Sequence, residues 1–131
     1  MKFLVSYDGS MASKEALKLA QEHADIYGAK LEIAKSVTRQ HPLKPGDIED
    51  AENKFEEEVR NFLNGSNVRY ETHLLISSKS SGENLVRFAE RKKADEIYVG
   101  ARKRSKAGKF LLGSTTQYVV LHAPCPVVTV K

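Results

Sequence analysis

The sequence predicts a single α/β domain over residues 1–131, built on a doubly wound, five-stranded parallel sheet with helices on both faces. First, segments typical of strands alternate with segments of helical periodicity, five of one and four of the other. Second, two apolar runs, 3–5 and 97–99, lack alternation, which is typical of neighbouring central strands covered on both faces. Third, residues 68–76 alternate between apolar and polar, which is typical of a half-exposed edge strand.

The N-terminal part is expected to begin with a strand at 2–7, and Ser10 is placed to cap the helix that follows. Gly28 ends that helix, and a second strand is expected at 31–37. Two prolines between 38 and 46 oppose regular structure. The residues that recur at helical spacing in the first helix are Ala12, Ala16, Leu19, Ala20, Ala24 and Tyr27.

The middle of the chain predicts helix, strand and helix in turn. Apolar residues between 48 and 62 recur at helical spacing, and Asn64-Gly65 is a typical helix stop. The alternating strand at 68–76 follows, and Ser80, Ser81 and Gly82 then open a third helix.

Two strands, 96–99 and 127–130, close the chain, and the short helix between them must end before Pro124. In the expected sheet the last strand lies at an edge, and it carries no charge until Lys131. Because an unprotected apolar edge invites pairing with another strand, we expect a homodimer formed through residues 127–130.

Composition favours a soluble domain. Hydrophobic residues make up 40% and charged residues 29%, which argues against a disordered chain, and no apolar run is long enough to span a membrane. The apolar N-terminus breaks at Asp8-Gly9-Ser10, too early for a signal peptide. The lone Cys125 cannot form an internal disulfide and is interpreted as a buried thiol. We therefore expect a cytoplasmic protein with no membrane partner.

Charge is unevenly distributed. The net charge is +4, and residues 102–109 hold a cationic cluster without any acid, whereas residues 47–58 are acidic except for Lys54. The acidic stretch is interpreted as a solvated helix face. The basic loop is framed by Gly100 and by Gly113-Ser114-Thr115-Thr116, which opens a helix. Such a loop suits phosphate, because free backbone N–H groups and the helix dipole both favour an anion.

Two polar segments converge on one crevice in this prediction. If the first and fourth strands are neighbours, the strand order reverses between them, and ligands of such sheets bind beyond the carboxyl ends at that point. Asp8-Gly9-Ser10 follows the first strand and Gly100 with the basic loop follows the fourth. Asp8 could instead serve only to end the strand and cap the next helix.

Over its whole length the sequence resembles the universal stress protein family. The resemblance lies in the strand ending at Asp8-Gly9-Ser10, the loop from Gly100 to Ser114, and the closing run from His122 to Val127. It implies a Rossmann-like sheet of strand order 3-2-1-4-5 and a homodimer through the last strand. It also implies that the chain binds ATP or a related adenine nucleotide, with or without magnesium, as a stress-linked regulatory protein.

Residue by residue, the resemblance implies that Asp8 meets the nucleotide and that backbone near Val37 contacts adenine. The phosphate loop falls on Gly100, Gly113, Ser114 and Thr115, and the expected nucleotide-binding residues also include Val99, Lys103 and Thr116. The family pattern has a glycine where this chain has Lys103. A side chain there resists positive φ, although a lysine also binds phosphate as a mobile charge.

Other functions find less support. The basic loop 102–109 could recruit an acidic protein partner in a chain that binds no nucleotide. We expect no nucleic-acid partner, because no aromatic residue between Arg102 and Lys109 offers base stacking. We find no catalytic residue and no metal-ligand spacing among the four histidines, so an enzyme activity would be at most slow ATP hydrolysis.

Overall fold

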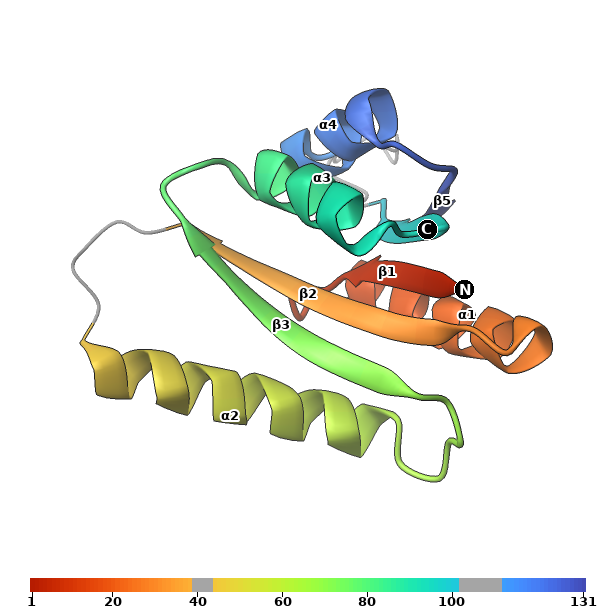
Figure 1. The fold of residues 1–131 in the computed structure, drawn as a ribbon, viewed down its shortest axis with the longest axis horizontal. Coiled ribbons are helices and arrows are strands. Elements are labelled where there is room, and N and C mark those ends of the chain that lie inside the picture. The colour runs from red at the N-terminus through yellow and green to blue at the C-terminus, as the bar shows by residue number, and fades with distance from the viewer. Residues whose placement is uncertain (39–43, 102–111) are drawn as a thin grey trace, which may run out of the picture.

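The computed structural model describes residues 1–38, 44–101 and 112–131. Five parallel strands form one sheet in the order β3-β2-β1-β4-β5, which confirms the predicted fold class (Figure 1). The strands are β1 (Lys2–Ser6), β2 (Lys30–Thr38), β3 (Tyr70–Ser77), β4 (Glu96–Gly100) and β5 (Val127–Val130). The helices are α1 (Met11–Tyr27), α2 (Pro45–Phe62), α3 (Ser81–Lys92) and α4 (Ser114–His122).

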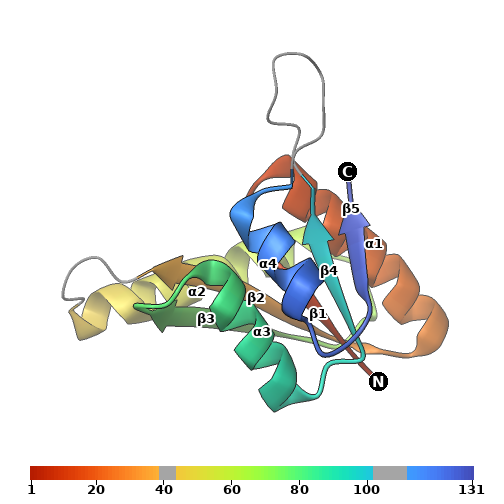
Figure 2. The same ribbon diagram turned by 90° about the horizontal axis from the view of Figure 1, so that it is seen from above.

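The two faces of the sheet carry separate apolar cores. On one face, β1 and β2 pack Phe3, Val5 and Ile33 against α1 and α2. On the other, Leu4 and Ile97 pack against α3 and α4. Figures 1 and 2 show the two helix pairs on opposite sides of the sheet. Because successive residues of a strand point to opposite faces, the unbroken apolar runs of β1 and β4 supply both cores at once.

The prediction of central and edge strands is confirmed. Leu4, Val5, Ile97 and Tyr98 are fully buried, and β1 lies between β2 and β4. β3 and β5 are the edges, and β3 is only partly buried along its length. None of the helices in the described ranges is long and apolar enough to span a bilayer.

Local details differ from the predictions at several positions. Pro45 is the first residue of α2, where its missing N–H is not needed, instead of opposing regular structure. In α1, Leu17 is fully buried, whereas Tyr27 is 64% exposed at the end of the helix, where its ring makes an edge contact with the Phe3 ring. β3 runs from residue 70 to 77 instead of 68 to 76.

Candidate functional site

A cavity of about 110 Å³ lies at the carboxyl ends of β1 and β4, where the strand order reverses. Its position is the one predicted from the sequence. Polar groups predominate among its described lining residues, which are Ser6, Tyr7, Asp8, Ser10, Ser13, Ser36, Ser81, Leu85, Gly100, Gly113, Thr115 and Thr116. Pockets for whole small molecules measure roughly 300–1,000 Å³, so this cavity accommodates only part of such a ligand.

The turn from β1 to α1 forms one wall and is closed by its own side chains. The Asp8 carboxylate accepts a hydrogen bond from the Ser10 N–H at 2.9 Å, and the Asp8 N–H donates to Ser13 Oγ at 3.3 Å. Ser10 caps α1 by accepting from the Ser13 N–H at 3.2 Å, and the Ser13 hydroxyl donates to the Ser10 carbonyl at 2.9 Å. Asp8 therefore has the turn-forming role that the sequence left open, and it still lines the cavity.

Tyr7 links the same wall to α2. It is 2% exposed, and its hydroxyl donates to a Glu58 carboxylate oxygen of α2 at 2.6 Å. Burial, followed by the Glu58 carboxylate, raises the pKa of Tyr7 far above its ordinary value. The phenol therefore stays protonated at every physiological pH, and α2 is tied to the end of β1.

The opposite wall begins at Gly100, which ends β4 against α1. A Cβ at this position would lie 2.7 Å from the carbonyl carbon of Ala12 and 2.8 Å from its Cβ. The glycine is therefore required by close packing of strand against helix, and its φ is not in the left-handed region. The buried Thr116 of α4 donates its hydroxyl to the Gly100 carbonyl at 2.9 Å, which joins the two ends of the loop.

The start of α4 differs from the starts of α1 and α3. Ser10 and Ser80 cap those helices with side-chain hydrogen bonds, whereas Gly113 is the N-cap of α4 and makes none. The first turn of α4 also carries no acidic residue. Within the described residues no side chain caps this turn, so its backbone N–H groups and its dipole suit an anion in the cavity.

The predicted site residues are brought together only in part. Asp8, Gly100, Gly113, Thr115 and Thr116 line the cavity. Three others do not line it: Val37 pairs with Ile76 within the sheet, Val99 is buried in the core shared with α3 and α4, and Ser114 is exposed at the start of α4. Lys103 and the basic loop 102–109 lie outside the described residues.

The structure adds several serines that the sequence analysis did not select. Ser6 and Ser36 lie near the carboxyl ends of β1 and β2, and Ser81 lies in the first turn of α3. Ser36 Oγ accepts a hydrogen bond from the Asn84 side chain at 2.9 Å. Single serines carry little signal in a sequence, but their place at the strand ends beside a switch point could have identified the first two.

These groups suit binding better than covalent chemistry. The described lining residues include no histidine or cysteine, and Asp8 is their only acid. Hydroxyls and backbone amides can hold a phosphorylated or hydroxyl-rich molecule by neutral hydrogen bonds and a helix dipole. Cys125 lies apart from these residues, half-buried, and burial raises the pKa of its thiol, which keeps it from being a reactive thiolate.

Comparisons with known proteins agree with this architecture. The family model of the universal stress protein family matches residues 1–131. A universal stress protein of Thermus aquaticus is 32% identical, with 98% of this chain and 96% of that protein covered. A universal stress protein structure from Archaeoglobus fulgidus is 30% identical with a TM-score of 0.84, covering 100% of this chain and 98% of the other. A structure from the same organism in complex with dAMP is 26% identical with a TM-score of 0.79, at the same coverage.

Proposed function

The chain belongs to the universal stress protein family, and we propose that it binds an adenine nucleotide, with ATP as the expected ligand, in the crevice between β1 and β4. The observation that carries the proposal is the uncapped start of α4 at Gly113, which lines the same cavity as Asp8. A helix start without a capping side chain favours an anion when it lines a cavity. The similar Archaeoglobus fulgidus protein solved with dAMP supports an adenine nucleotide as the anion.

In the proposed complex the phosphates lie at the first turn of α4, between Gly113 and Thr115. Ser6, Ser36 and Ser81, which line the cavity outside the β1–α1 turn, are placed to hydrogen-bond to ribose hydroxyls or phosphate oxygens. We assign adenine to backbone near Val37 and a phosphate contact to Lys103, as the resemblance implies. A cavity of about 110 Å³ fits the phosphate-bearing part of the nucleotide and leaves the base outside it.

Calorimetric titration with ATP and with dAMP, each with and without magnesium, tests the proposal. Gly113→Asp should abolish binding, because a carboxylate at the N-cap takes the N–H donors and repels phosphate. Gly46→Asp is the matched control, since it places the same charge in the first turn of α2, whose residues do not line the cavity. Adenine nucleotide in an acid extract of the purified protein would support the proposal independently.

Three results separate the outcomes. No heat with any of these nucleotides for the wild-type chain would contradict the proposal and favour the basic loop as a docking site for an acidic partner. Equal loss in both glycine variants would show a general charge effect instead of a site. Lys103→Gly restores the glycine of the family pattern, and tighter binding in that variant would show that Lys103 weakens the usual phosphate geometry.

We propose that the chain is a regulatory protein of the cytoplasm and that it acts as a homodimer. β5 is an edge strand in this chain, and Val120 and Leu121 of α4, the helix just before it in the chain, are exposed. An apolar edge of this kind is protected when a second copy pairs with it. Light scattering should give a dimer that Val128→Lys dissociates without loss of helical circular dichroism. A wild-type monomer at high concentration would contradict the dimer.

A further inference from the structure

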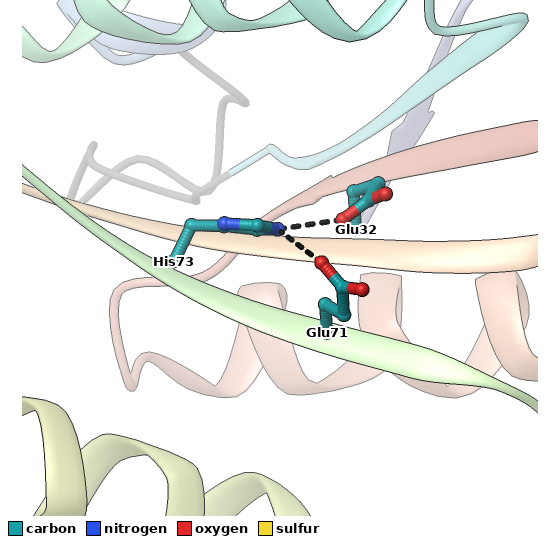
Figure 3. Close-up of side chains that lie close together, drawn as sticks. All are labelled: Glu32, Glu71 and His73. Carbon is teal, nitrogen blue, oxygen red and sulfur yellow. Dashed lines mark hydrogen bonds and ion pairs between the residues drawn. The ribbon is translucent and has the colours of Figure 1, made fainter.

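A second polar cluster lies on the sheet, distant from the nucleotide crevice along β2 and β3. It consists of Glu32 from β2 and Glu71 and His73 from β3 (Figure 3). The parallel register pairs Glu32 with Glu71 and Ala34 with His73, so all three side chains leave the same face of the sheet. One ligand atom from each lies within 4.8 Å of the other two.

Glu32 occupies an unusual position for a carboxylate. It is 1% exposed, on the face of β2 where Ala34 packs into the core with α3. Burying a carboxylate is unfavourable unless hydrogen bonds or a cation compensate for the lost water. One Glu32 oxygen lies 2.6 Å from His73 Nε2, and the other lies 3.4 Å from the Lys30 ammonium.

We propose that Glu32, Glu71 and His73 bind a divalent first-row transition metal ion, with zinc as the reference ion. One imidazole nitrogen and two carboxylate oxygens form a donor set that suits zinc, manganese or iron. Zinc–ligand distances are about 2.0–2.2 Å, so ligand atoms that lie within 4.8 Å of one another can share one ion once the side chains adjust. The His73 ring is already oriented by Phe88 of α3, at a centroid distance of 4.7 Å.

Lys30 is the competitor of the metal in this arrangement. Its ammonium lies 2.7 Å from Glu71 and 3.4 Å from Glu32, where it acts as the cation between the two carboxylates. Its side chain is 25% exposed, so it can move into water when an ion enters. Two carboxylates and a divalent ion are neutral when His73 is uncharged, so an entering ion can take over the role of the ammonium.

The site is open on the solvent side. Glu71 is 53% and His73 is 19% exposed at the side chain, and His73 also lines a groove between β3 and α3. A hydrated ion can therefore reach the cluster, and water can supply the remaining ligands. The ligands come from two strands, and Glu32 lies 41 residues before His73 in the chain. For this reason a search for local metal spacing in the sequence misses them.

The test uses the full chain, freed of metal and nucleotide, titrated with Zn²⁺ by calorimetry and with Co²⁺ by visible absorption. One equivalent should bind, and His73→Ala should weaken binding by about 100-fold, with a smaller loss of about 10-fold for the exposed Glu71→Gln. Lys30→Met should tighten binding by about 10-fold, because it removes the competing charge. His122→Ala is the matched control, since that histidine is exposed on α4 and should not matter.

The outcomes are decisive in either direction. No binding in the wild-type chain and in Lys30→Met would overturn the proposal and leave a buried ion-pair cluster. Equal affinity in the wild-type chain and His73→Ala would place the ion elsewhere and overturn it as well. Because nucleotide is absent from these titrations, their failure would leave the proposed nucleotide function untouched. Circular dichroism confirms that each variant is folded.

Discussion

The two loops that border the crevice each lead from a strand into a helix, but the two helices begin in different ways. At the β1–α1 turn, Asp8, Ser10 and Ser13 hydrogen-bond to one another and complete the start of α1. At the β4–α4 junction, Gly100 packs against α1 and Gly113 begins α4 with no capping side chain. Both helices point their first turns at one cavity, but among the described residues only α1 of the two has a capping side chain.

This difference separates stability from binding. Groups that already have partners in the folded chain contribute to the free energy of unfolding and offer little to a ligand. N–H donors without a capping side chain contribute less to folding and are available to a phosphate. Substitutions at the β1–α1 turn should therefore act mainly on the free energy of unfolding, and those at the start of α4 mainly on the affinity for the nucleotide. Gly100 is the exception, because it joins the second loop to α1.

The largest effect is expected for Gly100→Ala. The new Cβ would lie 2.7–2.9 Å from backbone and side-chain atoms of Ala12, so α1 must move away from β4. Overpacking of this kind typically costs about 1–3 kcal/mol, and contact with rigid backbone places this variant at about 3 kcal/mol. Urea unfolding measures it against Gly46→Ala, where nothing lies within 4 Å of the new atom. Equal stability of the two variants would contradict the close-packing role.

Gly113→Ser should turn the second loop into a copy of the first. A serine at the N-cap satisfies a donor of α4, which should stabilise the chain by a few tenths of a kcal/mol. The same hydrogen bond competes with phosphate, so affinity for ATP should fall by about tenfold, or about 1.4 kcal/mol. Thermal unfolding measures the change in stability, and calorimetric titration measures the change in affinity for ATP. A variant that binds ATP as tightly as the wild-type chain would show that the donors of α4 are not used.

Ser10→Ala should give the opposite pattern. Loss of the cap of α1 should lower the free energy of unfolding by about 1 kcal/mol, and the Ser13 N–H loses its acceptor. Ser80→Ala removes the equivalent cap of α3 and is the matched control, since Ser80 is not among the residues that line the cavity. Similar losses of stability in both variants are expected. A large loss of ATP affinity in Ser10→Ala alone would show that this turn also binds the ligand.

The smallest effect is expected for Tyr7→Phe. It removes the hydroxyl that donates to Glu58 at 2.6 Å and preserves the packing of the ring on Phe55. A hydrogen bond to a charged group contributes about 1.5–3 kcal/mol, but Glu58 is half-buried and can regain water, so a loss below about 1 kcal/mol is expected. Chemical denaturation measures it. A higher free energy of unfolding in the variant would show that burying the hydroxyl destabilises the folded chain.

The strand order could be predicted because a central strand, buried on both faces, has apolar residues at consecutive positions. Leu4 and Val5 face opposite sides, so both must be apolar, and the same holds for Ile97 and Tyr98. The site was less predictable. The importance of Gly100 rests on its contact with Ala12, and the Ser36 hydroxyl reaches the cavity through the packing of sheet and helix. Such contacts join segments distant in sequence, and no local pattern reports them.

The pairing of β1 with β4 has a kinetic consequence. The crevice exists only once these strands are side by side, and the Lys2 N–H then bonds to Asp95, 93 residues along the chain. Closing such a long loop is slow and is completed only as the native sheet forms. A ligand held between the two strand ends therefore recognises the native state alone, so it should lengthen the lifetime of the folded chain without hastening refolding.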